Sequence, residues 1–268
     1  VTERPRVDAS RAARRPEGGA WVARYALLTD IHANREALEA VLRDLAGRRA
    51  DRIAVLGDIV GYGADPAWCT DRVDELAAAG AIVLKGNHDA AVDRPDGAMN
   101  AVARAALDWT RPRLSAAQKA FLAALPLTAC EADIQFVHAS ADHPQDWIYV
   151  TGERSAWPSF AASKARVILC GHVHVPAIYS CDMTNRVQSQ RITTARPVPL
   201  IRSRRWLGVI GAVGQPRDGV PEAAYAILDT ATNELTFHRV AYDRAAAAAK
   251  LRAAGLPESL ALRLLNGS

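Results

Sequence analysis

Short apolar runs alternate with segments of helical spacing over the first third of the chain. The runs at 25–28, 53–56 and 81–84 have the length and composition of buried strands. After the first run, Asn34 can cap a helix whose apolar residues repeat at helical spacing until Gly47, and a second helix follows the next run. This β-α-β-α-β order predicts a parallel sheet with right-handed crossovers.

The pattern changes in the middle of the chain, where isolated apolar runs and a hairpin replace the regular alternation. The later elements that it predicts are two helices over 98–125 split near Pro112, strands at 134–137 and 167–170, a hairpin with strands near 223–229 and 234–240, and helices from about 243 and about 257. Together with the first third, these elements indicate the α/β fold class.

The two ends of the chain differ in character. Residues 1–20 are rich in Arg, Pro, Ala and Gly without a hydrophobic period, which predicts a disordered tail. Residues 21–268 contain no repeat and no clear linker, so we expect one domain with a basic insertion at about 181–206. The expected architecture is two β-sheets packed face to face with helices outside.

Composition is ordinary for a soluble globular protein: of 268 residues, 50% are hydrophobic and 23% are charged. No stretch approaches the ~20 apolar residues of a membrane span, and the N-terminus lacks the apolar core of a secretory signal. The four cysteines form no C-x-x-C pair, so we expect free thiols. These features predict a cytoplasmic protein without a membrane partner.

The net charge of +4 is unevenly distributed. Residues 1–24 carry +3 and residues 186–205 carry +6, which leaves the rest of the chain at −5. A protein that binds nucleic acid usually has a broad basic face, so nucleic acid is not the favoured partner. The arginine-rich segment 186–205 is either a solvated hairpin or loop, or a cationic rim for a polyanionic substrate or partner.

Candidate metal ligands follow five of the apolar runs. They are Asp30 and His32, Asp58, Asn87 beside His88, His138, and His172 with His174. Loops past the carboxyl ends of strands are where α/β folds assemble ligand sites, so this set predicts one polynuclear metal site. In an extended segment, residues two apart would point their side chains the same way, as we expect for Asp30 with His32 and for His172 with His174.

This series of motifs resembles the calcineurin-like metallophosphoesterase superfamily over about residues 25–240. The segments 57–63 and 213–219 resemble its compact bacterial and archaeal phosphodiesterase-like branch. The resemblance implies a four-layer α/β/β/α sandwich of two mixed β-sheets flanked by helices.

The resemblance also implies two divalent ions. The first would be held by Asp30, His32, Asp58 and His174, and the second by Asp58, Asn87, His138 and His172, with Asp58 bridging. His88 would be a catalytic histidine that faces the leaving group. Histidine and carboxylate ligands suit transition metals. We favour manganese or iron, and Ni²⁺, Co²⁺ and Zn²⁺ also suit such a site.

The sequence departs from the protein phosphatases of this superfamily. They carry Asp-Arg-Gly after the Gly-Asp motif, whereas this chain has Gly-Tyr-Gly around Tyr62, and its next motif ends in Asp89 rather than Glu. This counts against a protein phosphatase and leaves His88 without an orienting carboxylate. Tyr62 and Arg217 are candidate substrate contacts, and Asn34 is a helix cap or a third such contact.

These observations predict a dinuclear-metal-dependent phosphoesterase acting by attack of a metal-bridging hydroxide. A phosphodiesterase is favoured over a phosphomonoesterase, with a small phosphate ester or nucleotide as substrate. One alternative is a non-catalytic scaffold on the same fold, which the complete ligand set disfavours. The other is a nuclease, whose nucleic-acid binding would depend steeply on salt. The natural substrate, the metal pair and the oligomeric state are not determined by the sequence.

Overall fold

The computed structural model describes residues 22–94 and 99–268, so the predicted tail at 1–20 lies outside the described residues. The strands are β1 (Arg24–Leu28), β2 (Arg52–Val55), β3 (Ile82–Val83), β4 (Thr128–Glu131), β5 (Ile134–Val137), β6 (Val167–Cys170), β7 (Ala177–Cys181), β8 (Val187–Ser189), β9 (Pro197–Pro199), β10 (Arg205–Val209), β11 (Ala223–Asp229) and β12 (Glu234–Val240). The α-helices are α1 (Arg35–Ala46), α2 (Pro66–Ala78), α3 (Asn87–Asp93), α4 (Ala101–Thr110), α5 (Ala116–Ala124), α6 (Glu153–Ala162), α7 (Arg244–Ala253) and α8 (Glu258–Asn266). Two 3₁₀ turns, η1 (Arg111–Arg113) and η2 (Pro144–Asp146), complete the described elements.

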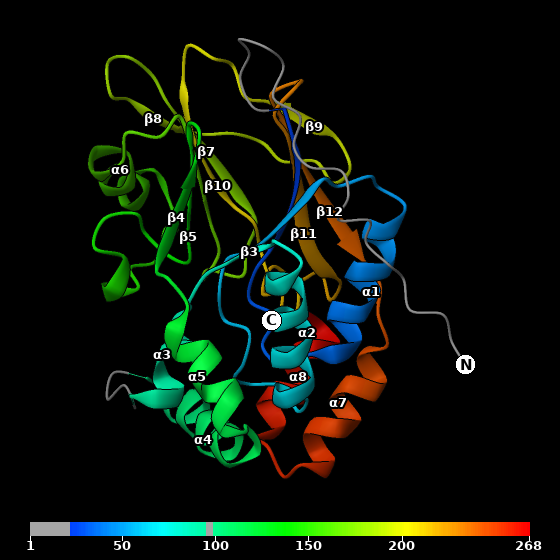
Figure 1. Ribbon diagram of the computed structural model, residues 1–268. Helices are drawn as coiled ribbons and strands as arrows, with labels where there is room; N and C mark the ends of the chain where they lie inside the picture. The colour runs from blue at the N-terminus through cyan, green and yellow to red at the C-terminus, as the bar shows by residue number, and fades with distance from the viewer. Residues whose placement is uncertain (1–21, 95–98) are drawn as a thin grey trace.

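The strands form two mixed sheets that pack face to face (Figure 1). The first has the order β3-β2-β1-β11-β12-β9, and the second has the order β4-β5-β6-β10-β7-β8. Within them, β1, β2 and β3 are parallel, as are β5, β6 and β10, while the remaining pairings are antiparallel. The predicted fold class of two mixed sheets flanked by helices is confirmed.

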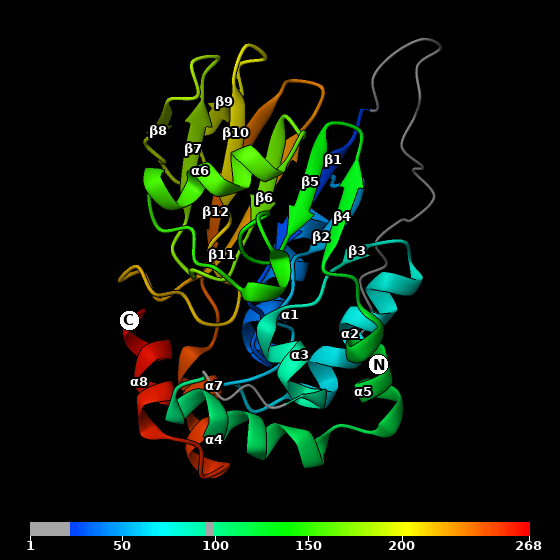
Figure 2. The ribbon, with the colours of Figure 1, turned by 90° about the vertical axis from the view of Figure 1, so that its left-hand side faces the viewer.

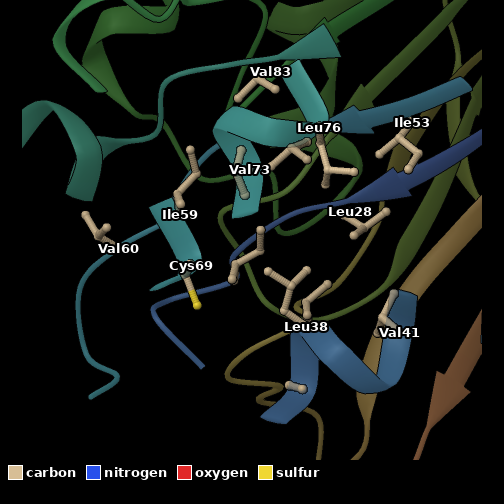
Figure 3. Close-up of a cluster of buried hydrophobic side chains, with 14 of the residues drawn as sticks. Leu28, Leu38, Val41, Ile53, Ile59, Val60, Cys69, Val73, Leu76 and Val83 are labelled. Carbon is tan, nitrogen blue, oxygen red and sulfur yellow. The ribbon is translucent and has the colours of Figure 1, made fainter. Parts of the chain in front are cut away.

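Successive residues of the central strands enter different cores because both faces of each sheet are covered. In β1, Leu27 packs between the sheets, and Leu28 packs against the helices outside the first sheet. Figure 3 shows the second environment, where Leu28 and Ile53 lie near Leu38 and Val41 of α1. This double burial explains why these strands read as continuous apolar runs.

Helices cover the outer faces unevenly. Helix α6 packs on β7, β8 and β10 of the second sheet, and α1 packs on β11 and β12 of the first. Helices α3, α4, α5, α7 and α8 gather at one end of the sandwich, below the strands in Figures 1 and 2. That is the end to which β1 and β2 point their carboxyl termini.

The arginine-rich segment lies at the other end of the sandwich. Strand β9 pairs with residues 234–236 of β12, next to the turn between β11 and β12. At this turn, the last residue of β11 pairs with Arg24, the first residue of β1. The candidate ligands follow the last residue of β1, so the segment does not border them. The segment therefore does not form a rim of the candidate metal site, whereas its role toward a polyanionic partner stays a prediction. Strands β7 and β8 pair as a hairpin, one of the two forms predicted for this region.

Two further expectations concern covalent and membrane features. All four cysteines are free, and Cys69, Cys170 and Cys181 are buried. None of the helices in the described ranges combines the length and apolar character needed to cross a bilayer.

Candidate metal centre

The candidate ligands meet at one end of the sandwich because their strands run in the same direction. Each lies at the carboxyl end of β1, β2, β3, β5 or β6, and the parallel pairing within each sheet brings these ends together. We call Asp30, His32 and His174 the first group, and Asp58, His138 and His172 the second group. Within each group the ligand atoms lie within 4.8 Å of one another, and all six side chains are buried.

In the first group, the nitrogen atoms of two imidazoles face each other. The Nε2 atoms of His32 and His174 lie 3.1 Å apart, and Oδ1 of Asp30 lies 3.2 Å from Nε2 of His174. That carboxylate oxygen is buried and has no hydrogen-bond partner among the described residues. Three candidate ligand atoms therefore converge on one point.

The second group connects to the first through Asp58. Its Oδ2 atom lies 3.5 Å from Nε2 of His138 and 3.6 Å from Nε2 of His32. The amide oxygen of Asn87 lies 3.2 Å from the same nitrogen of His138, and Nε2 of His172 is buried without a partner in the described ranges. One carboxylate oxygen thus stands between the two groups, as a bridging ligand requires.

Backbone carbonyls fix three of the ring orientations. Nδ1 of His32 lies 3.2 Å from the carbonyl of Val60, and Nδ1 of His138 lies 2.8 Å from that of Leu56. Nδ1 of His174 lies 2.6 Å from the carbonyl of Gln215. A carbonyl accepts only from N–H, so each of these rings, when it is neutral, presents a lone pair at Nε2. Lone pairs that face each other across 3.1 Å call for a cation between them.

The ligand loops are not extended, contrary to the prediction from residue spacing. Asp30 and His32 have φ angles of 53° and 48°, and His172 and His174 have 67° and 65°. Asp58 is also left-handed, with φ of 53°. Such conformations cost about 1 kcal/mol or more for a residue with a Cβ and persist only where the surroundings enforce them. Paired side chains therefore converge through tight turns, not through strand geometry.

Glycines allow the loops to approach one another closely. A Cβ on Gly86 would lie 2.1 Å from Oδ1 of Asp58 and 2.3 Å from its backbone nitrogen. A Cβ on Gly171 would lie 2.0 Å from the hydroxyl of Thr29, which donates a 2.9 Å hydrogen bond to Oδ2 of Asp30. Each glycine thus gives space to a candidate carboxylate ligand.

Both carboxylates of the centre are ionised. Burial alone would raise the pKa of Asp30, but the neighbouring His174 and His138 hold it below its usual range. The pKa of Asp58 is likewise low, because His138 and His88 outweigh the burial of the carboxyl. Asp58 in turn raises the pKa of His138 to about 9 against the effect of burial.

His88 forms a third close group with His32 and Asp58. Its backbone N–H donates to Oδ1 of Asp58 at 2.8 Å, and its ring packs 4.5 Å from that of Tyr62 and 4.8 Å from that of His32. No carboxylate accepts a hydrogen bond from the ring in the described part of the chain, so packing alone orients it. Burial lowers the pKa of His88 to about 4, which leaves the ring neutral at pH 7.

Asp89, to which the sequence reasoning gave no role, connects two loops of the centre. Its carboxylate accepts hydrogen bonds from the backbone N–H groups of Ile59, Val60 and Gly86, so it joins the Asp58 loop to the Asn87 loop. Burial, followed by the charge of Asp58, raises the pKa of Asp89 to about 7. The available signal was its place at the third helical position of α3, where an acidic side chain can turn back to cap the helix.

The three candidate substrate contacts have different surroundings. Asn34 caps α1 by accepting from the N–H of Ala37, and its amide donates to the carbonyl of Gly214, which favours the helix-cap interpretation. Tyr62 lies against His88 and His32. The guanidinium of Arg217 lies 5.6 Å from the Tyr62 ring and donates to the side chain of Gln215. Tyr62 and Arg217 thus border the centre.

Two aromatic residues beside the centre were also missed. The ring of Tyr149 stacks on His172 with centroids 4.0 Å apart, and that of Trp147 meets His138 edge-on at 5.8 Å. They lie in the loop between β5 and α6, where no periodic pattern marks them, so only their closeness to His138 in the chain could have suggested them.

Comparisons with known proteins agree with this geometry. A family model described as the calcineurin-like phosphoesterase superfamily domain matches residues 24–233. An uncharacterised protein of Methanocaldococcus jannaschii is 33% identical over 248 residues, which are 90% of this chain and 97% of that relative. The crystal structure of a metallophosphoesterase from Sphaerobacter thermophilus is 40% identical, with a TM-score of 0.81 over 92% of this chain and 100% of that one.

A hypothetical protein from Pyrococcus horikoshii OT3 shares the fold at 19% identity, with a TM-score of 0.75 over 91% of this chain and 98% of that one. Three observations point to the same family. They are the sandwich of two mixed sheets, the clustered histidines and aspartates, and the match of the family model over most of the chain. The chain therefore belongs to the calcineurin-like phosphoesterase superfamily, whose members are metal-dependent phosphoesterases.

Proposed function

We propose that this protein is a phosphodiesterase that uses two divalent ions to hydrolyse a small phosphate ester or a nucleotide. Asp30, His32, Asp58 and His174 would hold one ion. The other would be held by Asp58, Asn87, His138 and His172. The observation that carries this proposal is the single Asp58 oxygen between two groups of converging donors. Manganese or iron is the proposed native metal.

The donor set supports a metal centre over a purely hydrogen-bonded cluster. Asp30 Oδ1 and His172 Nε2 are buried without partners in the described residues, and buried polar atoms are rarely left unsatisfied. The opposed lone pairs of His32 and His174 would repel each other without a cation. Two ionised carboxylates against two divalent ions leave the centre positive, which attracts a phosphate anion.

The bound ions would supply the Lewis acidity that activates water at neutral pH and balances phosphoryl charge. The protein groups around them have separate tasks. The neutral His88 ring retains one N–H, with which it can donate to the leaving oxygen, a role worth about 10²–10⁴ in rate. Tyr62 keeps that ring in place, and Arg217 offers a cation at the edge of the centre.

A metal add-back assay tests the proposal. Purified protein is stripped of metal and assayed on bis-p-nitrophenyl phosphate and p-nitrophenyl phosphate with Mn²⁺, Fe²⁺, Ni²⁺, Co²⁺, Zn²⁺ or Mg²⁺. We expect metal-dependent turnover with the diester preferred, two ions per chain, and loss of both turnover and metal in Asp58→Ala. Asp74→Ala is the matched control, because this aspartate is exposed on α2.

Three results would contradict the proposal in different ways. Preference for the monoester would replace the phosphodiesterase with a phosphomonoesterase. Two bound ions without turnover of either compound would favour a scaffold or an enzyme with a narrow substrate range. Absence of metal binding would overturn the centre itself.

A further inference from the structure

An aromatic wall covers both histidines of the second group. The planes of Tyr149 and His172 are 24° apart in a stacked pair, and Trp147 meets His138 at 72°. The two aromatic residues are two positions apart in one loop, and each contacts a different candidate ligand of the same ion. We call the segment 147–149 the aromatic lip.

The loop that carries the aromatic lip is fixed in place. The N–H of Ser140 donates to the carbonyl of Ile148 at 3.1 Å, which closes the base of the loop, and the Ser140 hydroxyl lies 2.8 Å from that of Ser159 on α6. Trp147 has a left-handed φ of 53°, a conformation that bulky residues adopt only where the structure enforces it. The lip is therefore preorganised.

The side chain of Tyr149 has open area despite its contact with His172. The residue is 52% exposed, and its neighbour Ile148 is 44% exposed. One face of the phenol ring lies on the imidazole, so the exposed area belongs to its other face and its edge. The contact with His172 places the phenol ring at the metal centre.

A purely orienting role does not account for this exposure. His172 is the candidate ligand imidazole without a backbone carbonyl at a ring nitrogen in the described ranges, so Tyr149 does help to position it. A positioning contact would be served by a buried ring, however, whereas an open aromatic face beside a catalytic centre is typical of a ligand-binding surface. Aromatic rings of this kind stack on nucleobases, since every base has a flat face.

We propose that Tyr149 is the stacking surface for a nucleobase, and that the substrate class is therefore a nucleoside phosphodiester. This inference rests on the proposed phosphodiesterase function. A nucleotide separates its phosphate from its base by one sugar, which matches a phosphate at the second group and a base on the adjoining lip. Arg217 and Tyr62, which border the centre, remain available to the phosphate and its leaving group.

Two matched esters test the proposal on the metal-loaded protein. Thymidine 5′-(p-nitrophenyl phosphate) and methyl p-nitrophenyl phosphate share a leaving group and differ in the nucleoside. We expect the wild type to prefer the thymidine ester. Tyr149→Ala should lower the ratio of kcat/KM for the thymidine ester to kcat/KM for the methyl ester about tenfold, because any loss of His172 positioning affects both esters alike. Tyr149→Phe should behave as wild type, and Ile148→Ala is the control for the lip surface.

A binding measurement makes the proposal independent of turnover. Calorimetric titration should show that AMP binds about tenfold more tightly than ribose 5-phosphate, and that Tyr149→Ala removes this difference. An equal loss for both esters, or loss of metal in Tyr149→Ala, would reduce Tyr149 to a positioning contact for His172 and overturn the proposal. So would the absence of any base preference. Failure of both esters in the wild type, with base-dependent binding intact, would contradict the phosphodiesterase function alone.

Discussion

At the scale of single residues, backbone strain concentrates where the candidate ligands are. Asp30, His32, Asp58, His172 and His174 all have positive φ angles although none is a glycine. Strained residues of this kind cluster at functional sites because the surrounding structure enforces conformations that the free chain avoids. The glycines next to these loops leave very little space for an added Cβ, so we expect them to tolerate substitution poorly.

Gly86→Ala should disable the centre. The added Cβ would lie 2.1 Å from Oδ1 of Asp58, and both the carboxylate and its backbone would have to move. We expect metal loss and at least about a hundredfold loss of turnover, because displacements near 1 Å cost that much in active sites. Metal analysis and assay of Gly152→Ala, where the new Cβ meets open space, provide the control. Full metal content in Gly86→Ala would show that the loops have room to adjust.

His88→Ala should separate catalysis from metal binding. The ring is a candidate hydrogen-bond donor to the leaving oxygen and not a member of the proposed ligand sets, so turnover should fall about 10²–10⁴-fold while both ions stay. Metal content and steady-state kinetics measured on the same preparation check this. If the ions leave with the ring, His88 is a ligand, as its closeness to His32 and Asp58 would then explain.

The structure brings together the candidate ligands that the sequence singled out, but in conformations that the sequence did not predict. Residue type and position after an apolar run are visible in the sequence, and all seven candidate ligands lie in the centre. The left-handed turns were not foreseen, because they arise from packing between loops that are distant in the chain. For the same reason Asp89 and Tyr149 were missed, since their contacts are decided by the tertiary structure.

At the scale of elements, the arginines of the segment 186–205 are of two kinds: some bind the backbone of the fold, and others are exposed to solvent. The guanidinium of Arg205 donates to the carbonyls of Phe160, Ser163 and Ala165, at and just beyond the end of α6. Carbonyls at the end of a helix lack partners within the helix, so this side chain serves as a cap. Arg202 is exposed and forms no ion pair with a residue in the described ranges.

Arg205→Ala should destabilise the fold, whereas Arg202→Ala should not. Loss of three charge-assisted hydrogen bonds leaves carbonyls unsatisfied, for which we expect about 2 kcal/mol in the free energy of unfolding. Arg205→Lys should recover little, because one ammonium does not reach three carbonyls in that fork geometry. Urea denaturation of the three variants measures this. Equal midpoints for Arg205→Ala and Arg202→Ala would refute the capping role.

His238 gives the hairpin of β11 and β12 a predictable pH response. Burial and then the charge of Arg48 lower its pKa to about 4, and its ring stacks on Tyr225. The unfolded chain therefore binds this proton more readily, and stability is lost as the pH falls from about 6.5 towards 4. His238→Phe keeps a stacked ring without the titration. Its free energy of unfolding, measured by urea denaturation, should therefore fall less than that of wild type over this range, by on the order of 1 kcal/mol. If the free energy of unfolding depends on pH equally in wild type and in His238→Phe, the effect is ruled out.

Periodicity located some of the elements and missed others. The hairpin strands β11 and β12 occur where the sequence predicted them, and Asn34 caps α1 as expected. Helix α6 and strands β4, β9 and β10 were not predicted. Strand β9 has three residues, which are too few to show an alternating pattern. The pairing of these strands depends on neighbours in the two sheets.

At the scale of the whole molecule, metal binding should contribute to stability. The donors come from five loops on both sheets, so ions at the centre would link the two halves of the sandwich. A ligand that binds only the folded state stabilises it by about 2.7 kcal/mol at a hundred times its Kd. We expect chelation to lower Tm by several degrees and Mn²⁺ to restore it. Asp58→Ala should show no such shift, and an unchanged wild-type Tm after verified metal removal would count against the link.

The distribution of charge has a practical consequence for handling the protein. Four exposed arginines of the segment 186–205 lie at the end of the sandwich opposite the candidate ligands: Arg186, Arg191, Arg196 and Arg202. A negatively charged support such as silica or a cation exchanger would attract that end first. Adsorbed molecules would then present the metal centre to the liquid, so an immobilised preparation would keep its catalytic end accessible without an engineered linker.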